Sequence, residues 1–171
     1  KDVGDNDLHG DGDGGRFSSN VDKGRLKDVP GTKSTRHYSV FELGIDPKTG
    51  TMVGDVRQVA PDMGHDVDNY YACYLPDDRI VFASTAAYEG VPCVGGGAYV
   101  ANLYLMNNDG SNVRRLTFDQ DASWHPSVKA DGRIMYVRWE YTDSAHYYSR
   151  VVMTMNPDGS DQKAYYGTNS Y

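Results

Sequence analysis

Cysteine is scarce in this chain, and long apolar runs and helical patterns are missing from it. The 171 residues include two cysteines, Cys73 and Cys93, which are too few for a disulfide framework. No stretch approaches the roughly 18 apolar residues that a transmembrane helix needs, so we expect no membrane span. No window carries a sustained apolar period of about 3.6 residues, which predicts almost no helix. The Gly-x-Ser-x-Gly signature of a hydrolase nucleophile is also absent, which argues against a peptidase site.

Acidic residues outnumber basic residues in this chain. The chain has 17 lysines and arginines against 24 aspartates and glutamates, for a net charge of −7. Binding of nucleic acid requires basic patches that face the phosphates, so we expect no nucleic-acid partner. An acidic surface of this kind favours solubility.

What the chain does contain is a duplicated segment. Residues 71–82 align with residues 125–136 at an offset of 54, and residues 105–111 align with residues 154–160 at an offset of 49. Self-similarity at this spacing is typical of repeat architectures in which each unit is one supersecondary element. Each copy alternates β-branched and aromatic runs with Asp/Gly turns, which predicts short antiparallel strands. Cys73 lies in such a run and is expected to be a small buried hydrophobe.

We therefore predict an all-β fold, a β-propeller fragment of about two to three four-stranded antiparallel blades that form an incomplete ring. Residues 37–68 are expected to form outer strands of one blade, residues 69–122 a full blade, and residues 123–171 most or all of the next. Propellers close with roughly four to eight blades, so two sheet faces would be left uncovered. We expect the remainder of a propeller, or other subunits of a complex, to cover those faces.

The first 36 residues form a Gly/Asp-rich segment, acidic over its first 15 residues, whose composition predicts a loop or linker. Its alternating carboxylates are typical of calcium loops, where they converge on a hard cation. The candidate ligands are Asp5, Asp7, Asp11 and Asp13. The spacing of an EF-hand is not met, because the twelfth residue from Asp5 is Arg16 rather than Glu. A calcium site and a flexible acidic loop are the two interpretations.

A first group of candidate site residues lies at the start of a predicted inner strand, near the mouth of the propeller channel. Asp119, Asp121 and His125 are candidate catalytic residues, with His125 suited to proton transfer because imidazole titrates near neutral pH. In the alternative interpretation the aspartates cap the turn and His125 packs beside Pro126.

A second group combines charged and titratable side chains with aromatic residues in one hairpin connection. Its members, Arg138, Glu140, Asp143 and His146, are candidates for lining a ligand cleft. They are equally consistent with an inter-blade ion pair and a solvated hairpin tip.

Two resemblances to known families follow from these motifs. Residues 124–133, with the β run that follows them, resemble the TolB-type propeller repeat. From residue 66 to residue 171 the chain is similar to the propeller middle domain of the hydrazine synthase alpha subunit family. The motifs that carry the second resemblance are residues 90–96, 102–106, 116–121, 138–143, 146–150, 155–159 and 165–170.

The second resemblance implies a periplasmic or otherwise extracytoplasmic protein whose propeller forms one wall of a haem and zinc redox site. Haem c and zinc would be supplied by, or shared with, other domains of a multihaem oxidoreductase, and the family's larger complex also binds calcium. The resemblance assigns Cys93 as a zinc ligand, and its flanking glycines would let the backbone approach a metal closely.

Other features limit that interpretation. The Cys-x-x-Cys-His sequence that attaches haem is absent from the chain, and no other Cys/His spacing resembles a metal site. A partly buried, unreactive thiol is the alternative role for Cys93. The alternative function is a non-catalytic, TolB-like propeller that binds protein or glycan.

Overall fold

The computed structural model describes residues 18–21, 37–64, 66–90, 99–139 and 150–167. Within these residues the chain forms eleven β-strands and no helix, which confirms the predicted all-β class. Accordingly, the described part of the chain offers no helix with the length and hydropathy needed to cross a bilayer.

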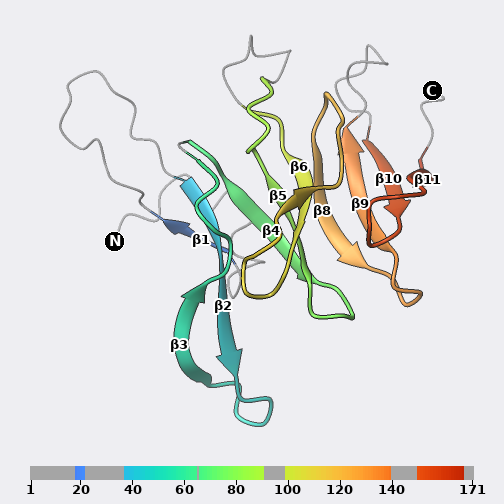
Figure 1. Cartoon of the computed structure of the whole chain (residues 1–171). Coiled ribbons are helices and arrows are strands. Elements are labelled where there is room, and N and C mark those ends of the chain that lie inside the picture. Colours follow the sequence, from blue (N-terminus) through green and yellow to red (C-terminus); the bar gives the residue numbers. More distant parts are fainter. Residues whose placement is uncertain (1–17, 22–36, 65, 91–98, 140–149, 168–171) are drawn as a thin grey trace, which may run out of the picture.

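The strands form three antiparallel sheets that follow one another along the chain (Figure 1). Their orders are β1-β2-β3, β4-β5-β6-β7 and β8-β9-β10-β11, so each four-stranded sheet has its first and last strands at opposite edges. The bounds are β1 Ser18–Val21, β2 His37–Ile45, β3 Met52–Gln58, β4 Asn69–Tyr74, β5 Ile80–Ser84, β6 Asn102–Met106, β7 Arg114–Arg115, β8 Ser123–Val128, β9 Ile134–Trp139, β10 Arg150–Met155 and β11 Lys163–Tyr166. The two duplicated segments form the two four-stranded sheets, which are neighbouring blades of a propeller fragment.

Strand β1 lies inside the segment 1–36 whose composition predicts a loop or linker. It pairs with the first half of β2, from Ser18 opposite Val40 to Val21 opposite His37. The segment therefore contributes one short strand to the first sheet.

The sheets stack face to face, and each interface between them is an apolar core. One cluster lies between the second and third sheets and includes Leu103, Leu116, Tyr136 and Met153. The other lies between the first and second sheets and includes the buried residues Val40, Val59, Phe82 and Tyr104. Since apolar burial is the main favourable term in folding, each blade is stabilised chiefly by its neighbours.

The Asn-x-Asp-Gly turns that join the outer strands are built alike in both blades. Asn107 donates its side-chain N–H to Ser111 Oγ at 3.0 Å, and Asp109 accepts the backbone N–H of Ser111 at 2.9 Å. Gly110 has a φ of +84°, a conformation that costs glycine little. The same bonds recur in residues 156–160. These side-chain bonds give the motif a structural reason to repeat.

The β2–β3 hairpin is longer than its counterparts. Val59 N donates to Val40 O at 2.9 Å, as Leu116 N does to Leu103 O at 2.7 Å in the next sheet. The first pair spans 19 positions and the second 13, so the β2–β3 hairpin holds six more residues. All of β3 is exposed, and the hairpin projects below the turns of the other sheets (Figure 1).

Candidate functional site

Both inner strands carry a β-bulge at the same position of the repeat. In β4 the register shifts between Tyr70 and Cys73, and in β8 it shifts between Trp124 and Ser127. Each bulge places a residue other than glycine at a φ of +53°, namely Tyr71 and His125. Because L-residues are strained in this region, Tyr more than His, each bulge stores of order 1–3 kcal/mol. Strained backbone of this kind concentrates at functional sites.

The two strained residues meet across the blade interface. The rings of Tyr71 and His125 have centroids 3.9 Å apart and are tilted by 30°. Tyr70 meets the Tyr71 ring edge-on at 5.0 Å, and Tyr38 from β2 meets Tyr70 edge-on at 6.3 Å. His125 is exposed while the tyrosines are partly covered. A continuous row of rings therefore crosses all three sheets and ends on an accessible imidazole.

The row of rings is embedded in a poorly solvated environment at its centre. Burial, and then the nearby charges of Asp68 and Tyr71, raise the pKa of Tyr70 far above its usual value. Asp68 itself ties two sheets together, since its carboxylate accepts the backbone N–H of Tyr38 at 2.8 Å. The Tyr70 phenol therefore stays neutral and acts in packing.

The structure brings together two of the predicted site residues, Asp119 and Arg138. Arg138 Nη1 lies 3.4 Å from Asp119 Oδ1, and Ser123 Oγ donates to Asp119 Oδ2 at 3.0 Å. Asp119 thus connects the loop that follows β7 to strands β8 and β9. Asp121 is buried nearby in sequence, with 7% of its surface exposed.

These contacts bear on the proposed catalytic group of Asp119, Asp121 and His125. The carboxylate of Asp119 is engaged by a guanidinium and a hydroxyl, and the His125 ring lies against Tyr71. A general base needs a basic group within hydrogen-bond reach of its substrate. The Asp119 carboxylate is bonded to β8 and β9 of the third sheet, and a catalytic role for Asp119, Asp121 and His125 stays a prediction.

An ionic and aromatic cluster at the same end of the second sheet was not anticipated from the sequence. Arg115 binds Glu89 through two parallel bonds of 3.0 and 3.1 Å, and its guanidinium lies 4.8 Å from the ring centre of Phe118. Tyr88 and Tyr99 form an edge-on pair at 5.4 Å on the adjoining connection. The charges of Arg115 and Glu89 are separated by 26 positions in sequence, so no local motif reveals the pair.

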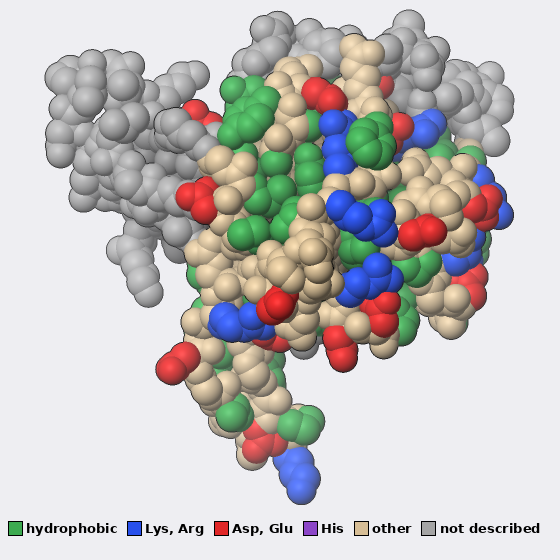
Figure 2. All heavy atoms as spheres, viewed as in Figure 1, with side chains coloured by type: hydrophobic (Ala, Val, Ile, Leu, Met, Phe, Trp, Pro, Cys, Tyr) green, Lys and Arg blue, Asp and Glu red, His purple; other side chains and the backbone are tan. Residues whose placement is uncertain are grey.

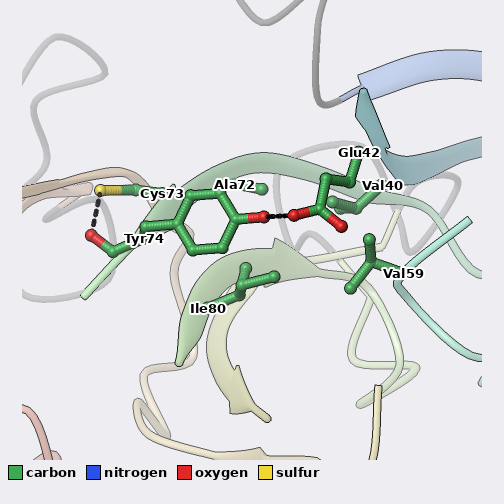
Figure 3. Close-up of a pocket in the computed structure, with 7 residues that line it drawn as sticks. All are labelled: Val40, Glu42, Val59, Ala72, Cys73, Tyr74 and Ile80. Atoms are coloured by element: carbon green, nitrogen blue, oxygen red, sulfur yellow. Dashed lines mark hydrogen bonds between the residues drawn. The ribbon is translucent and has the colours of Figure 1, made fainter. Parts of the chain in front are cut away.

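A small apolar pocket lies between the first and second sheets (Figure 3). It is lined by Val40, Glu42, Val59, Ala72, Cys73, Tyr74 and Ile80. Glu42 lies at one side of it and accepts a hydrogen bond from the Tyr74 hydroxyl and another from Arg57. Those two bonds lower the pKa of Glu42, while burial and the bond to Glu42 raise the pKa of Tyr74 to about 12.

The Cys73 side chain points away from this pocket (Figure 3), packs against the core between the second and third sheets, and is a thiol rather than a thiolate. Burial raises its pKa, and its Sγ lies 3.5 Å from the carbonyl oxygen of Tyr74. Metal ligation and nucleophilic attack both require the thiolate. The environment of Cys73 fits the small buried hydrophobe that its strand position predicts.

Several predicted site residues lie outside the described residues. These are Cys93 for zinc, Glu140, Asp143 and His146 for ligand binding, and Asp5, Asp7, Asp11 and Asp13 for calcium. Among the residues that the structure does describe, no group of three or more His, Cys, Asp or Glu side chains is arranged to hold a metal ion. Covalent haem attachment does not fit this chain, because Cys73 and Cys93 are 20 positions apart.

Comparison with known proteins bears on the fold. No family model and no curated protein matches the sequence. Among solved structures, the chain is similar to a protein assigned as TolB from Agrobacterium tumefaciens, with 19% identity and a TM-score of 0.51. The match covers 74% of this chain and 40% of that chain, so this chain spans less than half of the neighbour's length. The likeness shows the fold, a TolB-type β-propeller fragment, and leaves the activity to be inferred from the residues.

Proposed function

We propose that this chain is part of an extracytoplasmic, non-catalytic β-propeller that binds a protein partner through the inner-strand surface at Tyr71 and His125. The observation that carries the proposal is the repeated strained bulge, which holds one ring from each of two blades in contact at 3.9 Å. The strained conformation recurs at the same bulge of both inner strands, and strained backbone concentrates at functional sites. Aromatic rings with a polar edge supply large, rigid contact area at low entropic cost.

Two further features support binding rather than catalysis. The Asp119 carboxylate is engaged by Arg138 and Ser123 of the third sheet, as that of a structural residue would be. The structural neighbour is a TolB-type propeller, whose fold presents inner strands around a central channel. Preorganised rings on rigid strands would lose little entropy when a peptide packs against them.

Selection of linear peptides from a phage-displayed library on the immobilised chain tests this function. Tyr71→Asn and His125→Asn remove the rings while keeping a residue that tolerates a positive φ, so the fold should persist. We expect each substitution to weaken binding of the selected peptides at least about tenfold, the loss of one good contact of 1.4 kcal/mol. Tyr99→Asn is the control, since Tyr99 is exposed on another connection. Equal loss with Tyr99→Asn, or no loss with the other two, would refute the inner-strand surface.

The redox interpretation, in which the chain walls a haem and zinc site of a hydrazine synthase-like oxidoreductase, rests on sequence resemblance. Zinc analysis and a haem absorption scan of the intact protein test it. Retained zinc that is lost on Cys93→Ser would favour it over the binding propeller. For the calcium interpretation of Asp5, Asp7, Asp11 and Asp13, the test is a rise in melting temperature on adding millimolar calcium.

A further inference from the structure

One position of the repeat, at the end of the hairpin formed by the two outer strands, is buried in two sheets and exposed in the third. Val59, Leu116 and Tyr165 occupy this position, at offsets of 57 and 49 along the sequence. Val59 and Leu116 follow β3 and β7, and Tyr165 lies within β11. Their exposed fractions are 3%, 2% and 58%. Val59 is covered by the second sheet and Leu116 by the third. Tyr165 is thus a buried-type position whose ring lies 4.9 Å from the Lys129 ammonium and, among the described residues, has no apolar sheet over it.

The cover at the first two interfaces is a specific element, the glycine of the next blade's Asn-x-Asp-Gly turn. A Cβ on Gly110 would come within 2.4 Å of Val59 O, and a Cβ on Gly159 within 3.3 Å of Leu116 O. Gln162, beside the second turn, also donates to Leu116 O at 3.0 Å. Each turn therefore lies directly on the preceding sheet.

A cation on each outer strand reaches the same turn. Arg57 donates to Asn108 O at 3.1 Å, and Arg114 donates to Asp158 O at 3.0 Å. The equivalent residue of the third sheet is Lys163, 49 positions after Arg114. Lys163 is exposed and pairs with Asp161 of its own turn at 3.0 Å. Turn glycine and strand cation together make an inter-blade contact that the chain uses twice.

The side chains on the adjoining face of the third sheet can be matched to those of the second sheet by the same repeat offsets. Val81, Ala83 and Leu103 are fully buried between the second and third sheets. Their counterparts on the third sheet, Met135, Val137 and Val152, are apolar and only partly covered. Three positions differ. Thr154 stands in place of Leu105 and is bonded to Arg133 Nε at 3.1 Å. Lys129 stands in place of the buried Leu75, and Arg150 in place of the buried Ala101.

We propose that this face of the third sheet, hereafter the β8–β11 outer face, docks one more blade of the same repeat belonging to the same polypeptide. The interface would continue the two that the chain already makes, each of which joins consecutive sheets of one chain. The docking blade would carry an Asx-x-Asp-Gly turn whose glycine lies on the Tyr165 carbonyl. A backbone carbonyl of that turn, ahead of the glycine, would accept a hydrogen bond from Lys163. Its surface opposite Thr154 would be polar, to meet Arg133.

A tandem chain tests the proposal. It consists of residues 1–166 followed by a second copy of residues 118–167, with both tryptophans of the second copy changed to Phe. The added blade should raise the urea midpoint by about 1 M, because a new interface adds stability to a repeat array. Trp139 of the first copy, which alternates with Met135 and Val137 along β9, should also shift its emission to the blue. Tyr165→Asp in the first copy should remove both gains. An unchanged midpoint together with unchanged emission would overturn the proposal.

The 171-residue chain provides an independent test if the tandem chain does not fold. Binding of a hydrophobic dye to the chain should fall with Tyr165→Asp and leave the urea midpoint unchanged, whereas Leu116→Asp, at the equivalent covered position, should unfold the third sheet. Dye binding that Tyr165→Asp does not alter would count against the face. Sedimentation equilibrium distinguishes the occupant: self-association of the 171-residue chain that Tyr165→Asp abolishes would assign the face to a second copy and overturn the proposal.

Discussion

At the scale of single residues, close approach of two backbones fixes which positions accept a side chain. Gly110→Ala should destabilise the chain by about 2–5 kcal/mol, since a left-handed φ costs about 1–2 kcal/mol and the clash with Val59 O adds about 1–3 kcal/mol. Gly132→Ala is the matched control, because Gly132 has a φ of +81° with nothing within 4 Å of its Cβ. Urea unfolding measures both. Equal costs at the two positions would contradict the contact.

The Tyr74–Glu42 bond predicts a stability change in alkali. Burial and the bond to Glu42 raise the Tyr74 pKa from 10.0 to about 12, so the folded chain favours the neutral phenol. The resulting stability is fully present below about pH 10 and is lost as the pH rises through 12. The free energy of unfolding of the Tyr74→Phe variant should therefore fall less between pH 10 and pH 12 than that of the parent chain. Tyr165→Phe, on the exposed strand β11, is the control, and its free energy of unfolding should change with pH as that of the parent chain does. If Tyr74→Phe and the parent chain gave the same pH dependence, the linkage would be disproved.

At the scale of elements, one arginine holds the base of the long β2–β3 hairpin. Arg57 binds Glu42 within the hairpin and both the carbonyl and the side chain of Asn108 in the next blade. Arg57→Met should cost about 1–2 kcal/mol, because charge-assisted bonds are lost and Glu42 keeps only its bond to the Tyr74 hydroxyl. Arg114→Met, which removes one exposed bond to Asp158 O, should cost about 0.5 kcal/mol. Comparison of urea midpoints checks the order; a larger effect at Arg114 would contradict it.

The strands were predictable from sequence because each depends on local alternation and on turn residues. The Asn-x-Asp-Gly turns show this, since Asn, Asp and Gly act through bonds within five residues. The bulges at Tyr71 and His125 were not predictable, because tyrosine carries no preference for a positive φ. The alignment of residues 71–82 with residues 125–136 places the two rings at one repeat position, which was the available signal. That they touch depends on how blades stack, and stacking is a tertiary property.

At the scale of the whole molecule, the described sheets form a one-dimensional series in which each contacts its neighbours. The first and second sheets share one apolar core, and the second and third share the other. Stability in such arrays is approximately a sum of unit and interface terms. The middle blade, with a core on each face, should therefore be the last to lose its amide protection, and the effect of a core substitution should depend on the interface in which it lies.

Two core substitutions separate those interfaces. Val40→Ala, between the first and second sheets, should cost about 1–3 kcal/mol and increase hydrogen exchange in β2 and β3 while β9 and β10 stay protected. Leu116→Ala, between the second and third, should cost about 2–5 kcal/mol and release β9 and β10 while β2 stays protected, because its side chain packs against the turn at Gly159. Hydrogen exchange read by mass spectrometry resolves the strands. If either substitution increased exchange equally in all three sheets, the chain would be a single cooperative unit. The additive view of its blades would then be wrong, and the docking of a further blade also rests on that view.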